Sequence, residues 1–200
     1  MDIILASKSP RRKKLLEEMN LKFNVISSSF NESKVSISHK SPHKYCMKLA
    51  EYKCKSVSKD HLDTLVIGSD TIVYHNKKIL NKPKNKNEAE MHLRLLSDST
   101  HTVYTGVFAH IKSKNIALGF YDKTYVTFYK LNEKDISYYI NYFKPYDKAG
   151  SYGIQDWSMV FVKKINGCFN NVVGFPVSKF FKLGLENSAM KIIIRNNLNQ

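Results

Sequence analysis

The sequence predicts a protein of the α/β class, with a mixed, elongated central sheet flanked by helices. Strand-like and helix-like patterns alternate through the first half of the chain. A continuous apolar run at 64–68 is typical of a strand that is buried on both faces. Two longer runs, 102–111 and 116–129, show the alternation of a half-exposed antiparallel pair. Alternating elements followed by clustered strands indicate a sheet with mixed strand directions.

The first elements are a short strand at 3–5, a polar loop and a helix at 10–20. Ser9 is the expected N-cap of this helix and Pro10 suits its first position. Ser41 and Pro42 open a second helix in the same way. The other expected strands, in chain order, lie at 22–26, 64–68, 71–74, 78–80, 102–111, 116–129 and 158–165. The other expected helices begin at Asn87 and after Asn132 and lie at 176–185; the tail, 186–200, is weakly periodic.

Length and charge limit the organisation and the partners. Two hundred residues, 1–200, fit one domain, or one domain with two lobes. The formal net charge is +15, but the lysines are spread along the chain together with many asparagines. A nucleic-acid site would cluster this charge on one face, so a nucleic-acid partner is not expected. A generally positive field would still steer small anions inward.

The three cysteines, Cys46, Cys54 and Cys168, form no CxxC pair and have no zinc-type spacing. An odd number of cysteines, without the apolar region of a signal peptide, favours a reducing compartment. No stretch approaches the length of a membrane span. We therefore expect a cytoplasmic protein with no membrane partner.

The loop and first helical turn after the first strand indicate an anion site. A helix N-terminus carries partial positive charge, yet this turn holds Arg11, Arg12, Lys13 and Lys14. The chain has only four arginines, and two of them are adjacent here. Arginine binds phosphate in a bidentate manner, and strand–loop–helix junctions bind phosphate readily. The alternative interpretation is a solvated basic turn.

Isolated carboxylates and lysines are the other candidates for chemistry. Asp70 interrupts an apolar strand pattern, so it is either a metal ligand or general base, or a turn residue bonded to its own backbone. Pro83 fixes an extended backbone at Lys82 and so directs that side chain. Glu32 by itself resembles a solvated loop charge. Basic loops, carboxylates and lysines together fit phosphoryl chemistry with a divalent cation.

Other residues are assigned structural roles. The seven histidines have no convincing ligand spacing, and His101 is expected to be a surface or cap residue. Trp157, the sole tryptophan, could stack on a base, but a core or rim position is favoured. No serine nucleophile elbow and no Cys–His signature is found.

Several stretches together resemble the Maf family of nucleoside triphosphate pyrophosphatases, named for septum formation. They occur in the family's order and cover nearly the whole chain. The matching segments are Leu5-Ala6-Ser7-Lys8-Ser9-Pro10-Arg11-Arg12, Leu49-Ala50-Glu51-Tyr52-Lys53, Gly68-Ser69-Asp70-Thr71-Ile72-Val73, Lys82-Pro83, Thr105-Gly106, Asp147-Lys148-Ala149-Gly150-Ser151-Tyr152-Gly153-Ile154-Gln155 and Asn171-Val172-Val173-Gly174-Phe175-Pro176.

The resemblance implies a two-lobed fold with a cleft, similar to that of the inosine triphosphate pyrophosphatases. It implies hydrolysis of a nucleoside triphosphate to the monophosphate and pyrophosphate with a divalent metal cation, Mg, Mn or Co. Asp70 matches the proton acceptor that activates water, and Lys82 is a second expected catalytic residue. Glu32 and Asp70 are the expected metal ligands. The expected substrate-binding residues are Ser7, Ser9, Arg11, Arg12, Lys53, Thr71, Lys148 and Gln155.

Two positions indicate the subtype. Family members that cleave dTTP and UTP resemble this chain in having Thr after the catalytic Asp and Gln after Gly-Ile, which here are Thr71 and Gln155. Together with Arg11 they are the expected specificity positions, since a carboxamide pairs with both a donor and an acceptor of a pyrimidine. The chain departs from the family at Asp156-Trp157, where the family has Gly, so added bulk is expected to narrow the base pocket.

The leading hypothesis is a dTTP- and UTP-hydrolysing enzyme that cleans the nucleotide pool, with a homodimer as one assembly to test. The alternative is a nucleotide-binding regulator of cell division with little hydrolysis, suggested by the family's link to septum formation and by Asp156-Trp157. A nucleic-acid binder is the third hypothesis, which the scattered charge disfavours.

Overall fold

The computed structural model describes residues 1–198, and its centre is one mixed sheet. Within these residues the sheet has seven strands in the order β2-β1-β3-β5-β6-β7, and β4 also pairs with β3. β1 is parallel to β2 and β3, and the other pairs are antiparallel. The strands are β1 (Ile3–Leu5), β2 (Asn24–Val25), β3 (Leu65–His75), β4 (Lys78–Leu80), β5 (Thr100–Ile111), β6 (Ile116–Phe128) and β7 (Val162–Asn166).

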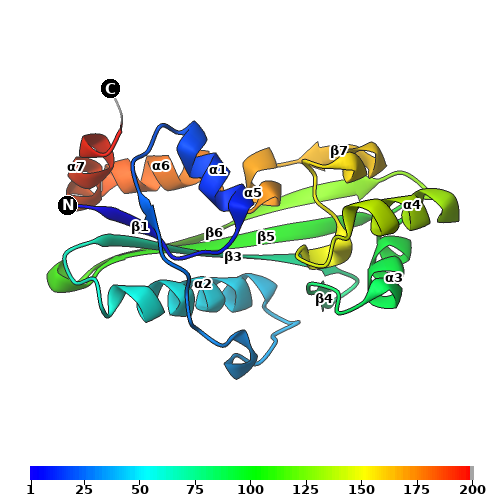
Figure 1. Cartoon of the computed structure of the whole chain (residues 1–200), viewed down its shortest axis with the longest axis horizontal. Coiled ribbons are helices and arrows are strands. Elements are labelled where there is room, and N and C mark those ends of the chain that lie inside the picture. Colours follow the sequence, from blue (N-terminus) through cyan, green and yellow to red (C-terminus); the bar gives the residue numbers. More distant parts are fainter. Residues whose placement is uncertain (199–200) are drawn as a thin grey trace.

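Helices cover both faces of this long sheet (Figure 1). One face packs against α2 (Pro42–Ser58), which contributes Leu49 and Cys54 to two small apolar clusters. The opposite face carries the main core and is covered by the remaining helices. These are α1 (Pro10–Glu18), α3 (Lys86–Leu96), α4 (Glu133–Phe143), α5 (Phe169–Val173), α6 (Val177–Glu186) and α7 (Ser188–Asn196). The expected α/β class, with an elongated mixed sheet between helices, is confirmed.

The polar break expected within the third strand is absent, because β3 continues through Ser69 and Asp70. Its backbone pairs with β5 without interruption from Val66 to Tyr74, and Asp70 lies opposite Gly106. A strand ends when its backbone loses partners, and polar side chains alone do not end it. The apolar pattern breaks at Ser69–Thr71 because Asp70 and Thr71 line a cavity, while the buried Ser69 hydroxyl donates a hydrogen bond to the carbonyl oxygen of Gly174.

The gap between β1 and β4 creates that cavity. Both strands pair with the same edge of β3, β1 with residues 65–67 and β4 with residues 73–75. The edge of β3 between them is left uncovered by either strand. Successive strand residues point to opposite faces, so Asp70 and Thr71 can reach one cavity only at such an edge.

Two other expectations were wrong. The strand expected at 158–165 begins only at Val162, because a 3₁₀ helix occupies Trp157–Phe161. Asp156 caps this helix by accepting a hydrogen bond from the Ser158 amide. Helices α5 and α7 were also missed. His101 is not a surface residue: it is 1% exposed, and its ring packs edge-on against Phe128 and Tyr152.

Two glycines allow α2 to approach the sheet. A Cβ at Gly68 would lie 2.4 Å from the carbonyl oxygen of Ala50, and a Cβ at Gly106 would lie 2.8 Å from that of Cys46. Both contacts are with helix backbone, which cannot move aside as a side chain does. The close approach places Lys53 of α2 beside β3, at the cavity.

Candidate active site

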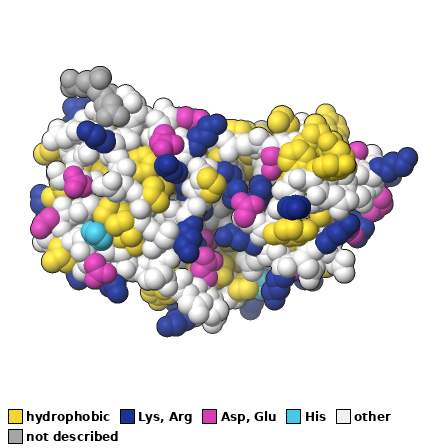
Figure 2. Space-filling view, in the orientation of Figure 1, with side chains coloured by type: hydrophobic (Ala, Val, Ile, Leu, Met, Phe, Trp, Pro, Cys, Tyr) yellow, Lys and Arg dark blue, Asp and Glu magenta, His cyan; other side chains and the backbone are white. Residues whose placement is uncertain are grey.

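A cavity of about 430 Å³ opens beside the uncovered edge of β3. One wall is the segment from Ala6 to Arg12, and the opposite wall is the loop from Asp147 to Gln155. Lysine, arginine and acidic side chains gather around the hollow in the middle of the molecule (Figure 2). The structure brings all the sequence-predicted site residues to this cavity: Ser7, Ser9, Arg11, Arg12, Glu32, Lys53, Asp70, Thr71, Lys82, Lys148 and Gln155.

The first loop forms as its sequence predicts. Ser9 caps α1 by accepting a hydrogen bond from the Arg12 amide, and Pro10 occupies the first turn. No acidic residue lies in that turn, so the positive end of the helix is not offset locally. The Ser7 hydroxyl accepts from the Ser9 amide, which fixes the loop at the end of β1. This geometry suits an anion.

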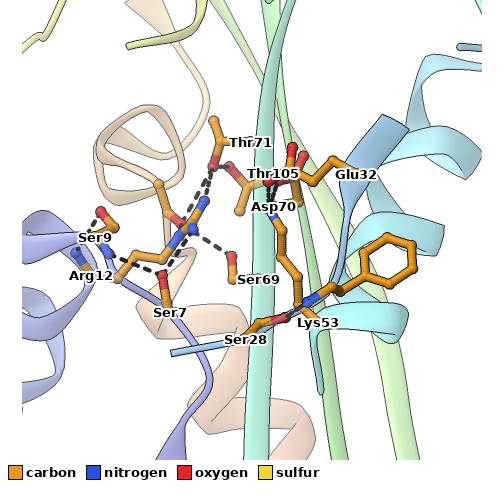
Figure 3. A network of polar contacts seen from close by, with 12 residues as sticks. Ser7, Ser9, Arg12, Ser28, Glu32, Lys53, Ser69, Asp70, Thr71 and Thr105 are labelled. Atoms are coloured by element: carbon orange, nitrogen blue, oxygen red, sulfur yellow. Dashed lines mark hydrogen bonds and ion pairs between the residues drawn. The ribbon is translucent and has the colours of Figure 1, made fainter. Parts of the chain in front are cut away.

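Each of the three nitrogens of the Arg12 guanidinium donates a hydrogen bond (Figure 3). Its Nε donates to the carbonyl oxygen of Gly174 at 2.9 Å, Nη1 to the Ser7 hydroxyl at 3.1 Å and Nη2 to the Thr71 hydroxyl at 3.0 Å. Burial lowers the pKa of Arg12, and the negative charge of Asp70 opposes this shift. Arg12 therefore holds the first loop, β3 and the end of α5 together, as well as supplying charge.

Gly174 is the common acceptor of this network. Its carbonyl oxygen also accepts from the Ser69 hydroxyl at 3.2 Å. Its φ of 126° lies in the region that favours glycine, so this residue both ends α5 and directs its carbonyl toward β3. Thr71 in turn lies 3.0 Å from the Thr105 hydroxyl, which donates to the carbonyl oxygen of Asn171. The matching Asn171–Pro176 stretch thus supports the first loop and Thr71.

A lysine joins the two carboxylates of the cavity. Lys53 Nζ lies 2.5 Å from Asp70 Oδ1 and 2.8 Å from Glu32 Oε1 (Figure 3). Lys53 and Asp70 are largely buried, whereas about half of the Glu32 side chain is exposed. Partial burial disfavours the charged form of Glu32, but the adjacent Lys53 ammonium outweighs it and lowers the pKa of Glu32. Glu32 is therefore an ion-paired cavity residue and not a solvated loop charge.

Among residues 1–198, no three His, Cys, Asp or Glu side chains form a group that could hold a metal ion without other ligands. Glu32 and Asp70 nevertheless converge on one ammonium at the cavity, and their oxygens are the hard donors that Mg²⁺ prefers. Magnesium is commonly held by one or two carboxylates together with substrate phosphates. The two residues fit such a shared site.

The wall opposite the first loop is held by a glycine turn. Gly150 has a φ of 67°, packs against Val73 and donates its amide to the carbonyl oxygen of Asn81, next to Lys82. His92 Nδ1 lies 2.8 Å from the Ser151 hydroxyl, and His101 Nε2 lies 2.8 Å from the Tyr152 hydroxyl. These buried contacts position the segment that leads to Gln155.

Asp156 and Trp157 are not among the residues that line the cavity, although Asp156 Oδ2 lies 3.7 Å from Nζ of the lining residue Lys148. The Asp156 carboxylate accepts from Ser158 and from the Tyr139 hydroxyl. Trp157 packs against Tyr138, with ring centroids 4.9 Å apart, in the favoured rim position. Asp156-Trp157, one of the two grounds for a non-hydrolysing regulator, thus lies outside the cavity lining.

Several cavity residues were missed: Lys8, Ser28, Phe30 and Asp147 line it as well. Phe30 stacks on Tyr52 with ring centroids 4.9 Å apart. Asp147 contacts Arg11 at 2.6 Å, although 136 positions separate them. Lys8 and Asp147 belong to the matching segments, but no local pattern marked them as site residues.

The fold and site define an α/β protein with a cavity between a basic helix N-terminus and a lysine-paired carboxylate. The model of the Maf-like protein family matches residues 2–186. The chain belongs to the Maf family.

Curated relatives match over most of their length. A dTTP/UTP pyrophosphatase of Bacillus anthracis is 46% identical over 180 residues, which are 90% of this chain and 92% of the relative. A dTTP/UTP pyrophosphatase of Thermosipho melanesiensis is 44% identical over 183 residues, covering 92% and 96%. Each is a protein that this chain resembles.

Solved structures resemble the chain weakly. A HAM1 protein from Coxiella burnetii is 12% identical, with a TM-score of 0.38, covering 64% of this chain and 73% of that one. This match does not bear on the fold or the function. In the described part of the chain, no helix has the length and apolar character needed to cross a membrane.

Proposed function

We propose that this protein hydrolyses dTTP and UTP to the nucleoside monophosphate and pyrophosphate in the cytoplasm. The observation that carries the proposal is that all the predicted residues line one cavity. The proposed base, Asp70, and the basic first loop both belong to this lining. The printed activity of the relatives supports the choice of substrates.

In this proposal Asp70 accepts the proton of the attacking water. Its carboxylate is held at the cavity by Lys53, whose Nζ lies 2.5 Å from Asp70 Oδ1. Arg11, Lys148 and Lys82 neutralise the phosphate oxygens on which charge develops. A divalent cation bound by Glu32 and Asp70 would supply further stabilisation of that charge.

The specificity end of the site is formed by Gln155 and Thr71. The Gln155 carboxamide has one donor group and one acceptor, as a pyrimidine edge requires of its partner. Thr71 is fixed by Arg12 and Thr105, so its hydroxyl is presented in one orientation. Asp156 lies outside the cavity lining.

A nucleotide panel tests the proposal. Purified protein with Mg²⁺ or Mn²⁺ is incubated with dTTP, UTP, 7-methyl-GTP and ATP, and both pyrophosphate and orthophosphate are measured. We expect pyrophosphate from dTTP and UTP and much less from the two purine nucleotides. Orthophosphate as the product, or no turnover of any nucleotide, would overturn the proposal. Gln155→Glu is the companion variant and should lower kcat/KM for dTTP.

A further inference from the structure

Asp147 is an acidic residue in a cavity that otherwise attracts anions. The cavity is lined by six cationic side chains and three acidic ones. Two of the acids, Glu32 and Asp70, share Lys53. The third, Asp147, belongs to neither this pair nor the Arg12 network, and the proposed reaction gives it no role.

Each oxygen of the Asp147 carboxylate binds a different cation of the site. Oδ2 accepts from Arg11 Nη1 at 2.6 Å, and Oδ1 accepts from Lys148 Nζ at 2.8 Å. Arg11 comes from the first wall of the cavity and Lys148 from the opposite wall, so the carboxylate connects the two. Partial burial disfavours its charge, but these two cations outweigh this effect and lower the pKa of Asp147 to about 2. It is therefore ionised near neutral pH.

A phosphate group has the same preferred partners as this carboxylate. Arg11 donates Nη1 to the Asp147 carboxylate and Nη2 to the Asp147 carbonyl oxygen at 3.4 Å, so it can offer these two nitrogens to a phosphate only by leaving Asp147. About half of the Asp147 side chain is exposed, so the exchange does not require refolding of the loop. An anion entering here must compete with Asp147, and an anion leaving is replaced by it.

We infer that the Asp147 carboxylate competes with phosphate groups for Arg11 and Lys148, and so weakens retention of the pyrophosphate product. The inference rests on the proposed function for the identity of that product. Asp147 acts as an internal competitor: it raises KM for the triphosphate and prevents pyrophosphate from blocking the cavity.

The affinity of the intact protein for inorganic pyrophosphate, measured by calorimetry, tests the role of Asp147 without turnover of a nucleotide. Asp147→Asn removes two partly exposed ion pairs that compete with the ligand, so it should bind pyrophosphate about two- to thirtyfold more tightly than the wild type. Asp147→Ser should also bind pyrophosphate more tightly than the wild type. Serine has no side-chain amide that could replace the contacts of the carboxylate. Asp122→Asn is the matched control, because Asp122 pairs with Lys179 outside the cavity and its replacement changes the net charge equally.

The kinetic arm uses dTTP as substrate and pyrophosphate as inhibitor. For Asp147→Asn we expect the inhibition constant and KM to fall by similar factors, with kcat changed far less. A wild type that does not turn over dTTP would contradict the proposed function, whereas the calorimetric comparison would still decide the role of Asp147. Equal or weaker pyrophosphate binding by both Asp147 variants, with melting temperatures unchanged, would overturn the inference.

Discussion

At the scale of residues, Asp70 and Thr71 show how neighbours in sequence acquire different partners. Asp70 faces α2 and contacts Lys53, whereas Thr71 faces the opposite side and accepts from Arg12. Both line the cavity because β1 and β4 leave this edge of β3 uncovered. One dipeptide thus serves both the proposed base and the proposed specificity position.

Replacing Asp70 by Asn should abolish most turnover. The amide cannot accept the proton of water, and loss of a general base typically costs about 100- to 10,000-fold in rate. Nucleotide binding should be largely retained, because Lys53 keeps Glu32 as a partner. Pyrophosphate release and calorimetric binding of dTTP are measured in parallel, with Asp60→Asn as a surface control. A variant that keeps more than half of the activity would remove Asp70 from this role.

Replacing Arg12 by Lys keeps the charge but loses the planar fork. A lysine cannot reproduce the three hydrogen bonds to Gly174, Ser7 and Thr71. We expect the free energy of unfolding to fall by about 1–3 kcal/mol and KM for dTTP to rise. Urea unfolding and steady-state kinetics measure the two effects. Arg94→Lys, at an exposed ion pair, should change neither, and equal effects of both substitutions would contradict the network's importance.

Residue chemistry alone predicted part of this site. The paired arginines and the uncompensated helix turn indicated an anion site, and Asp70 stood out against an apolar background. The joint placement of the predicted residues followed from the family resemblance, because their spacing in sequence does not say which strands are neighbours. Asp147 could not be assigned, since its partner Arg11 is 136 positions away.

At the scale of elements, the position of Lys53 depends on how closely α2 packs on the sheet. Gly68→Ala would place a methyl group 2.4 Å from the Ala50 carbonyl oxygen, so helix or strand must shift. Overpacking of this kind typically costs about 1–3 kcal/mol. The same shift would move Lys53 away from Asp70, so activity should fall together with the unfolding free energy.

Gly119→Ala is the matched control for Gly68→Ala. Its nearest contact would be a Phe108 side-chain atom at 3.1 Å, which can move. Chemical unfolding of the two variants should therefore show a clearly larger loss for Gly68→Ala. Similar losses would mean that the glycine is needed for some reason other than the approach of α2.

Most elements were predictable because their local signals agree with their packing. Helices α1 and α4 begin after the predicted N-caps Ser9 and Asn132, and α2 begins at Pro42. The two long alternating runs form β5 and β6. The errors arose where tertiary contacts override the pattern. β3 passes through polar residues because β5 pairs with it throughout. α7 was missed for a different reason: its apolar residues lie on one helix face, which buries Met190 and Ile194 in the main core, but this periodicity was not recognised in the tail.

At the scale of the whole molecule, acid should destabilise the fold through a buried histidine. Burial, and the nearby charge of His75, lower the pKa of His101 from 6.5 to about 3. The folded chain therefore keeps His101 neutral, whereas the unfolded chain binds a proton below pH 6.5. The contribution of neutral His101 to the free energy of unfolding is complete above about pH 6.5 and is lost as the pH falls toward 3.

Urea unfolding at pH 7 and pH 4.5 measures this effect. The wild type should lose stability between the two values, and His101→Gln should lose less, whatever its stability at pH 7. The Gln side chain keeps a hydrogen-bonding group near Tyr152 without titrating. The same pH dependence in both proteins would assign the acid sensitivity to other groups, such as His92, whose pKa burial also lowers.

The carbonyl oxygen of Gly174 has a consequence for how the protein is made. Arg12 emerges early from the ribosome, but its acceptor is synthesised 162 residues later. Until then Arg12 and Ser69 both lack the acceptor that joins the first loop and β3 to the end of α5. A nascent chain can pair β3 with β5 well before this point, yet its anion site stays unassembled. Activity should therefore arise late in translation, so that incomplete chains do not act on the nucleotides around them.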